Sequence, residues 1–279
     1  MSESLYEFRL GELPLLISFP HSGTYVPPWL KLRLTPAAID LPDTDWFVPQ
    51  LYGFHRELGA SVILATHSRY VVDLNRPPDG ALLYPGQRET PICPTESFDG
   101  EALYPLGGEP NSSEVAERVH RYWQPFHDKL AELGQELVQR HGFCILWDAH
   151  SIHSTLPGLF EGRLPDLNVG TADGHSCSPS ILGLVVARLN AQQRFTHVID
   201  GRFKGGYITR HYGNPAAHVH AVQLEIAQSA YLVESRTPAF NQAIADPLTS
   251  VLRILLQAVS AYRPSRLGPQ RGQEHHGRS

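Results

Sequence analysis

Two histidines in this chain stand where strands are expected to end. Residues 143–147 form an apolar run that leads into Asp148 and His150, and the apolar run at residues 13–20 leads into His21. Short apolar runs are typical of strands buried on both faces, and ligands of open α/β sheets bind beyond the carboxyl ends of such strands. The pattern therefore predicts that the two histidines meet at one edge of a sheet.

Two histidines at a sheet edge indicate a metal site. Catalytic zinc takes three protein ligands from histidines and carboxylates and leaves one position open. Asp43 and Asp45 are the candidates for the third ligand, in a segment that contains Pro42. We favour Asp45, but it could instead cap a helix, and spacing alone leaves both aspartates open. Either histidine, taken alone, could also be an ordinary core or surface residue.

A metal-activated water needs a base, and Glu225 is the candidate for it. Residues 221–226 alternate in polarity, which places Gln223 and Glu225 on one face of a predicted strand. The same alternation would suit a half-buried ion-pair partner. Asp148 shares a strand face with His150. It is expected to orient the His150 imidazole by contacting the ring nitrogen that does not bind the metal.

Arginines flanked by turn residues form a second group. Arg69, Arg76 and Arg210 stand near glycine, asparagine or threonine, and Asn75 precedes one of them. The planar guanidinium can hold a carboxylate through two parallel hydrogen bonds. These four residues therefore predict an acidic substrate, with structural salt bridges as the alternative for each arginine.

The elements that would carry these residues alternate along the chain. Periodicity predicts further strands at 60–65, 197–200 and 221–226, and helices at 113–141, 178–193 and 237–262, the first of them kinked by Pro125. This alternation predicts an α/β fold. The stretch 75–110 is rich in proline and glycine, and we expect a functional loop that covers the site. Residues 265–279 are polar and predict a disordered tail after a catalytic domain at 1–264.

Composition narrows the class of partner. The 279 residues carry a formal net charge of −5, which gives no electrostatic reason to expect nucleic acid or an anionic membrane. No segment is expected to span a bilayer, and no signal peptide is expected at the amino terminus. The three cysteines are widely spaced and favour a reducing, cytoplasmic setting over a disulfide framework. The expected partner is a small molecule, and the sequence does not indicate an oligomeric state.

Six motifs, taken in order, resemble the N-formylglutamate amidohydrolase family. The resemblance runs from about Leu13 to about Glu234, and its motifs lie at residues 18–23, 41–46, 72–77, 146–151, 201–213 and 223–225. Any one of them is a weak signal, but the ordered set is specific. The chain departs from the family pattern at Ile152 and His153, where methionine and proline are frequent.

The resemblance implies a fold and a reaction. The family is similar in fold to zinc carboxypeptidases and zinc amidases, which implies a single-domain mixed sheet flanked by helices. It implies His21, Asp45 and His150 as metal ligands and Glu225 as the base. The implied reaction is the hydrolysis of N-formyl-L-glutamate to formate and L-glutamate, as in histidine degradation.

Further alternatives remain open from the sequence. The same metal chemistry could act on another N-acyl amino acid or a short peptide. The chain could also be a non-catalytic binder of acidic metabolites. Histidine and carboxylate ligands accept metals other than zinc. His153 and His211 receive no role.

Overall fold

A mixed sheet of seven strands runs through the computed structural model, which describes residues 4–83, 86 and 88–264. The strand order is β1-β3-β2-β4-β7-β5-β6. Strands β1 and β3 pair antiparallel, as do β5 and β7, whereas the other neighbours are parallel. The strands are β1 (Tyr6–Arg9), β2 (Leu15–Phe19), β3 (Ser61–Ala65), β4 (Cys144–Ile152), β5 (Leu167–Gly170), β6 (His197–Ile199) and β7 (Val219–Ala227). The expected mixed sheet flanked by helices is confirmed.

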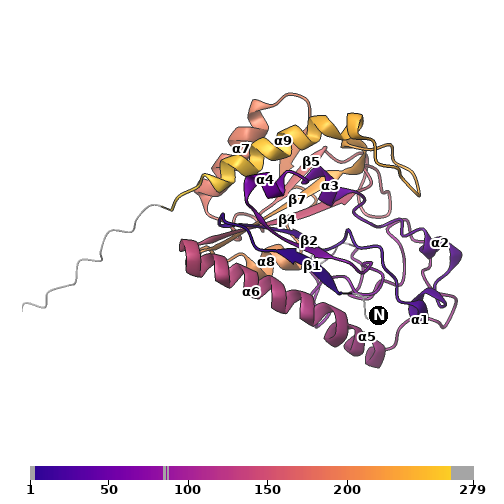
Figure 1. The fold of residues 1–279 in the computed structure, drawn as a ribbon. Coiled ribbons are helices and arrows are strands. Elements are labelled where there is room, and N and C mark those ends of the chain that lie inside the picture. Colours follow the sequence, from indigo (N-terminus) through magenta and orange to yellow (C-terminus); the bar gives the residue numbers. More distant parts are fainter. Residues whose placement is uncertain (1–3, 84–85, 87, 265–279) are drawn as a thin grey trace, which may run out of the picture.

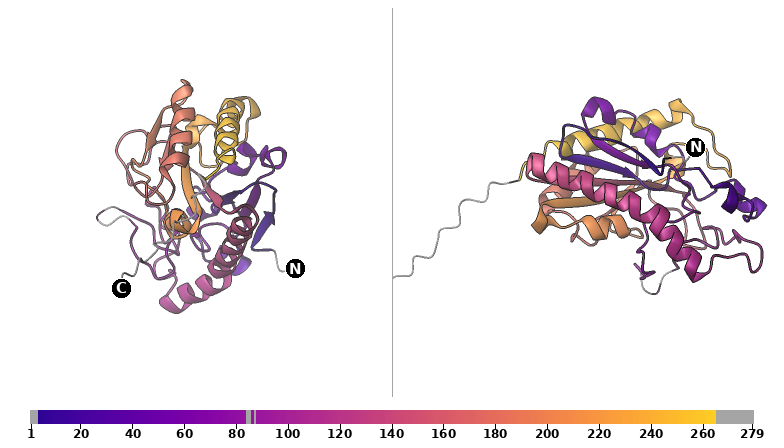
Figure 2. Two further views of the ribbon diagram at one scale, coloured as in Figure 1. Left: turned by 90° about the vertical axis from the view of Figure 1, so that its left-hand side faces the viewer. Right: turned by 60° about the horizontal axis from the view of Figure 1, so that its bottom comes forward.

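Helices cover both faces of this sheet (Figure 1). One layer contains α3 (Val48–Leu51), α4 (His55–Leu58), α7 (Pro179–Ala191) and α9 (Gln242–Ser260). The other contains α5 (Ser112–Arg118), the π-helical turn η1 (Val119–Trp123), α6 (Gln124–His141) and α8 (Tyr207–Tyr212). Figure 2 shows the same layers from two further directions. The short helices α1 (Pro28–Lys31), α2 (Pro36–Ile39), η2 (Pro215–Ala217) and η3 (Gln228–Ala230) lie in the connections.

The central strand β4 is buried along its whole length, because helices cover both of its faces. Its alternating side chains enter two different cores: Trp147 packs with the α7 and α9 layer, and Leu146 packs with the α6 layer. Asp148 and His150 continue the Leu146 face, since side chains of a strand alternate with period two. Asp148 and His150 therefore lie on the α6 and α8 side of the sheet.

The predicted helix at 113–141 is confirmed as the continuous run α5, η1 and α6. Pro125 has no N–H to donate to the carbonyl of Arg121, and its ring crowds that carbonyl in a regular α-helix. The chain passes this point with the π-helical turn Val119–Trp123 directly before the proline. Turns of this kind widen the helix by one residue and are frequent at functional sites.

Two expectations about the last helix need correction. Helix α9 begins at Gln242 rather than near Thr237, because the Asn241 side chain accepts the Ala243 N–H at 3.0 Å and caps it there. Its 19 residues are also long and apolar enough to cross a membrane by length and composition, which we did not expect of any segment. In the structure, however, Leu248, Leu252 and other residues of α9 are buried in the core shared with α7.

The connection between β3 and α5 contains no helix or strand among its described residues. Several of them, including Arg76, Thr90 and Phe98, line a cavity at the carboxyl ends of the parallel strands β2, β4 and β7. The expected tail at 265–279 lies outside the described residues.

Candidate metal centre and catalytic site

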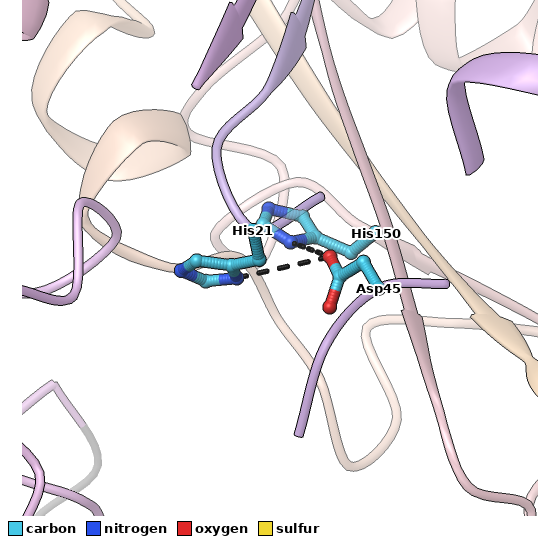
Figure 3. Close-up of side chains that lie close together, drawn as sticks. All are labelled: His21, Asp45 and His150. Atoms are coloured by element: carbon cyan, nitrogen blue, oxygen red, sulfur yellow. Dashed lines mark hydrogen bonds and ion pairs between the residues drawn. The ribbon is translucent and has the colours of Figure 1, made fainter. Parts of the chain in front are cut away.

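His21, Asp45 and His150 meet at the edge of the sheet where they were expected (Figure 3). His21 follows β2, His150 is on β4, and Asp45 lies in the loop before α3. Each can offer one ligand atom, and the three atoms lie within 4.8 Å of one another. Oδ2 of Asp45 is 3.0 Å from Nδ1 of His150 and 3.7 Å from Nδ1 of His21. All three residues are buried.

Each imidazole meets a second carboxylate on the side opposite Asp45, and this contact orients the ring. Nε2 of His21 hydrogen-bonds to Oδ1 of Asp73 at 2.7 Å, and Nε2 of His150 is 2.9 Å from Oδ2 of Asp148. With Nε2 held in this way, Nδ1 of each histidine faces Asp45. A carboxylate behind a ligating imidazole fixes its tautomer and raises its basicity, so this donor set fits a divalent cation.

The two imidazoles differ in charge. Burial and the charge of Arg69 lower the pKa of His21, although Asp73 opposes this. Burial also disfavours charge on His150, but Asp148 and Asp45 outweigh it and raise its pKa well above the usual range. As a metal ligand, His21 would already be neutral, whereas His150 would have to release a proton to bind a cation.

Arg69 ties the acidic groups of the centre together. Its Nη2 donates to Oδ2 of Asp73 at 2.6 Å, and its Nη1 is 4.0 Å from Oδ1 of Asp45. Burial disfavours the charge of Asp73, but Arg69 and His21 hold the pKa of that carboxyl well below its usual range. Arg69 lines the cavity, but its guanidinium already interacts with the carboxylates of Asp73 and Asp45.

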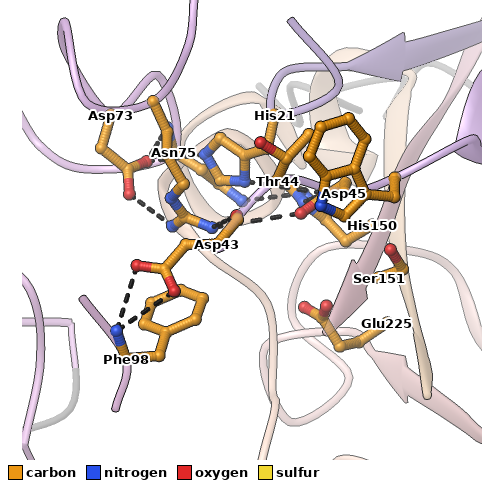
Figure 4. A network of polar contacts seen from close by, with 12 residues as sticks. His21, Asp43, Thr44, Asp45, Asp73, Asn75, Phe98, His150, Ser151 and Glu225 are labelled. Carbon is orange, nitrogen blue, oxygen red and sulfur yellow. Dashed lines mark hydrogen bonds and ion pairs between the residues drawn. The ribbon is translucent and has the colours of Figure 1, made fainter. Parts of the chain in front are cut away.

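Asp43 points away from the histidines (Figure 4). Its two carboxylate oxygens accept the backbone N–H of Phe98 at 3.2 and 3.0 Å. Burial raises the pKa of Asp43 to about 6, with Arg69 opposing the shift. Asp45 is thus the aspartate that the fold places with the histidines, and Asp43 instead holds the segment that carries Phe98.

Glu225 lies beside the centre on β7, in register with His150 on β4. Burial raises the pKa of Glu225 to about 8, with His150 opposing the shift and Asp45 reinforcing it. The neighbouring Gln223 amide is oriented by the Gly206 N–H, which donates to Oε1 at 2.7 Å. Nε2 of Gln223 therefore faces Oε2 of Glu225, at 3.4 Å.

The side chain of Asn75 connects the turn before Ile208 with the residues of β4 at the site. Its Oδ1 accepts the N–H of Ile208 at 2.7 Å, and its Nδ2 lies 3.2 Å from Oδ2 of Asp148 and 3.0 Å from Nε2 of His150. A Cβ atom on Gly206 would lie 2.4 Å from Nδ2 of Asn75, so only glycine allows this approach. Gly206 thus packs between Asn75 on the histidine side and Gln223 on the Glu225 side.

The predicted substrate residues do not all reach the cavity. Arg69, Asn75 and Arg76 line it together with Glu225 and the three cluster residues. Arg210 is on α8, where its Nε donates to the Gly205 carbonyl at 2.8 Å, and it is not among the residues of the cavity wall. Its role in substrate binding stays a prediction.

Four contributors were missed by sequence reasoning: Asp73, Gln223, Arg88 and Arg202. Asp73 and Gln223 could have been found, because each lies within two residues of a predicted site residue in a motif already recognised. Arg88 and Arg202 line the cavity from long connections. No periodicity indicates where such side chains point.

The recognised motifs are matched by comparison with known proteins. A family model described as N-formylglutamate amidohydrolase matches residues 13–232. The chain belongs to the N-formylglutamate amidohydrolase family. An N-formylglutamate deformylase of Pseudomonas putida is 45% identical over 264 residues, covering 95% of this chain and 98% of that one. The family resemblance expected from the sequence is confirmed.

Solved structures support the fold of this family member. An N-formylglutamate amidohydrolase from Ralstonia eutropha aligns with a TM-score of 0.74 and 24% identity, over 91% of this chain and 95% of that one. A gene product of Agrobacterium tumefaciens aligns with a TM-score of 0.70 and 17% identity, over 92% and 96% of the two chains. At these identities the likeness concerns the fold.

Proposed function

We propose that this protein is a metal-dependent N-formylglutamate deformylase, which hydrolyses N-formyl-L-glutamate to formate and L-glutamate. The observation that carries the proposal is the buried cluster of His21, Asp45 and His150 with the carboxylate of Glu225 beside it. The activity printed for the 45% identical Pseudomonas relative supports the same reaction. Histidine degradation is the pathway that the family resemblance implies.

Zinc is the metal we propose, held by Nδ1 of His21, a carboxylate oxygen of Asp45 and Nδ1 of His150. Two histidines and one carboxylate are a ligand set typical of catalytic zinc. When bound, zinc supplies a Lewis acid for the formyl oxygen and lowers the pKa of water toward neutrality. The cytoplasm is the proposed compartment, because Cys93, Cys144 and Cys177 are buried and free.

The protein residues supply proton transfer and orientation. Glu225 accepts the proton of the attacking water as the new carbon–oxygen bond forms. It then passes this proton to the amide nitrogen as the carbon–nitrogen bond breaks, which releases formate and the amino group of glutamate. Gln223 keeps Glu225 in place, while Asp73 and Asp148 keep the imidazoles in place. The proposed substrate-binding residues remain Arg69, Asn75, Arg76 and Arg210. Arg69 and Asn75 would act mainly by holding other residues of the site in position.

Formate release from N-formyl-L-glutamate tests the proposal, measured before chelation, after chelation and after zinc is restored. We expect activity that is lost to the chelator, regained with zinc and low on N-acetyl-L-glutamate. Metal-dependent activity on the acetyl compound alone would move the substrate to another N-acyl amino acid. Metal-loaded protein that binds acidic metabolites and turns over neither compound would indicate a binder instead of an enzyme.

A further inference from the structure

Four residues of the site lie close together on one irregular segment of the chain. Arg69, Asp73, Asn75 and Arg76 all belong to residues 69–76, which contain no helix or strand. The position of such a segment depends on contacts from other elements, because it has no regular backbone hydrogen bonds of its own. The helical run of α5, η1 and α6 supplies several of these contacts.

Trp123 and His127 hold two backbone carbonyls of this segment. Nε1 of Trp123 donates to the Arg76 carbonyl at 3.0 Å. Nε2 of His127 lies 2.9 Å from the Leu74 carbonyl. Both side chains are buried, and their rings stack with centroids 3.7 Å apart, as residues four apart on one helix face can do. The pair therefore fixes the chain on both sides of Asn75.

His127 acts as a neutral hydrogen-bond donor. Burial lowers the pKa of His127 to about 3, although the bond to the Leu74 carbonyl opposes this shift. A neutral imidazole carries one N–H, and a carbonyl can only accept, so the proton lies on Nε2. Nδ1 then accepts from the hydroxyl of Tyr212, at 2.9 Å. Both ring nitrogens are thus engaged in holding other groups, and His127 is not among the residues of the cavity wall.

The π-helical turn η1 brings a third donor to the same side of the helical run. The Gln124 N–H donates to the Val119 carbonyl, five residues earlier, so residues five apart lie nearly above one another. Arg118 and Trp123 are five residues apart, and in a regular α-helix they would point about 140° away from each other. Nη1 of Arg118 donates to the Val71 carbonyl at 3.2 Å. Arg118 therefore reaches the first part of the segment, and Trp123 reaches its end.

The segment in turn contacts the metal centre and the cavity. The Asn75 N–H donates at 2.8 Å to Oδ1 of Asp73, the same oxygen that hydrogen-bonds to His21. Nδ2 of Asn75 lies 3.0 Å from Nε2 of His150, and Arg76 lines the cavity. A displacement of the segment would therefore disturb both histidines and one wall of the cavity.

We propose that Trp123 and His127 are positioning residues of the site. His127 holds Asn75 where the metal centre requires it, and Trp123 holds Arg76 where the substrate requires it. The π-helical turn contributes by aligning the donors of the helical run on one face. This inference rests on the proposed deformylase function, since it assigns the two residues to metal binding and substrate binding at that same site.

Trp123→Phe tests the first contact, because it removes the N–H and keeps an aromatic ring. In the zinc-loaded protein, KM for N-formyl-L-glutamate should rise about 3- to 10-fold, as expected for the loss of one hydrogen bond, while kcat stays within about twofold. Trp29→Phe is the matched control, because Trp29 lies on α1, is partly exposed and is not in the cavity wall. An unchanged KM in Trp123→Phe, or a fall in kcat as large as the rise in KM, would overturn the role of Trp123.

His127→Leu tests the second contact through the zinc affinity, measured by competition with a chelator and independently of turnover. We expect binding to weaken about 3- to 10-fold, because the Leu74 carbonyl loses its donor and Asn75 shifts. His127→Gln keeps an N–H near the position of Nε2 and should recover most of the loss. His120→Leu, an exposed residue of η1, should have no effect.

A purely structural role of His127 predicts a different result. It would lower the melting temperature of His127→Leu and leave the zinc affinity of the folded protein unchanged, which would refute the proposal. An equal loss of zinc affinity in the leucine and glutamine variants would also refute it. Circular dichroism of each variant reports whether its fold is intact.

Failure of this inference can be told apart from failure of the proposed function. A wild-type protein without turnover of N-formyl-L-glutamate would contradict the function itself. The zinc affinities of the His127 variants would still test the role of His127. Calorimetric binding of L-glutamate to the wild type and to Trp123→Phe would test the role of Trp123, and equal affinities would refute it.

Discussion

His150 lies between the carboxylates of Asp45 and Asp148, and in the proposed metal site this position sets the protonation of a ligand. Because the two aspartates raise the pKa of His150 well above its usual range, its metal-free imidazole is protonated near neutral pH. A metal ion must displace that proton from Nδ1.

Metal uptake should therefore release a proton from His150 and a further fraction of a proton from Glu225, whose pKa is raised to about 8 in the metal-free protein, and the apparent affinity should fall by at least about tenfold for each pH unit of acidification near neutral pH. Zinc titrations by calorimetry in two buffers with different ionisation enthalpies measure the proton count. In Asp148→Asn, which removes one of the two carboxylates, fewer protons should be released at the same pH. A proton count near zero for the wild type would contradict this account of His150.

In the proposed mechanism Glu225 transfers a proton, and it is not one of the three residues grouped as possible metal ligands. Glu225→Gln keeps the size of the side chain and removes its basicity. We expect kcat to fall by about 10²- to 10⁴-fold, the contribution typical of a general base, with zinc content unchanged. Steady-state kinetics and metal analysis on the same sample measure both. Loss of zinc in parallel with activity would instead make Glu225 part of the metal site.

At the scale of elements, the turn before α8 joins the two halves of the site. A Cβ atom at position 206 would lie 2.4 Å from Nδ2 and 2.5 Å from Cγ of Asn75. Gly206→Ala should therefore displace Asn75 and lower the free energy of unfolding by about 1–3 kcal/mol, as overpacking does. Activity should fall as well, because Asn75 contacts His150 and Asp148.

Gly183 provides the matched control. It lies in α7, and an added Cβ atom there would meet nothing within 4 Å. Gly183→Ala should raise the free energy of unfolding by about 0.5–1 kcal/mol, because alanine is the better helix former. Urea denaturation of both variants measures the difference. A Gly206→Ala protein as stable and active as the wild type would show that Asn75 can move freely.

The sequence predicted the inner strands well, because buried strands leave a clear apolar signature. Strands β2, β3, β4 and β7 were each expected within a few residues of their observed bounds, as was β6, a half-buried strand at one edge of the sheet. The edge strand β1 has three exposed residues among its four and gave no such signal. Strand β5, although buried, has only four residues, too few to show a period.

The site residues that lie on or directly after strands could be predicted from the sequence. His21, His150 and Glu225 follow from strand pattern, and their meeting follows from parallel order in the sheet. The choice of Asp45 over Asp43 could not follow, since it depends on how the loop turns one carboxylate toward Phe98. The contributions of Arg88 and Arg202 depend in the same way on connections whose path no periodicity encodes.

At the scale of the whole molecule, all three cysteines are buried and unpaired. Burial raises the pKa of Cys93 to about 11 and those of Cys144 and Cys177 to about 12. At pH 8 only about one Cys93 thiol in a thousand would be ionised, and fewer of the others. Ellman's reagent should find three thiols in denaturant and almost none in the folded protein. Fast labelling of the native state would show that the fold opens around a cysteine.

The pairing of β4 with β7 places His150 directly opposite Glu225. Their backbones are separated by one strand spacing, about 4.8 Å, which main-chain hydrogen bonds maintain. A slip of one residue between these strands would turn one of the two side chains to the opposite face of the sheet. The distance between His150 and Glu225 is therefore set by the pairing of β4 with β7, and any unfolding step that separates these two central strands removes it. Turnover can then serve as a reporter of folding: in urea it should vanish together with the circular dichroism signal of the backbone, without an earlier, separate inactivation step.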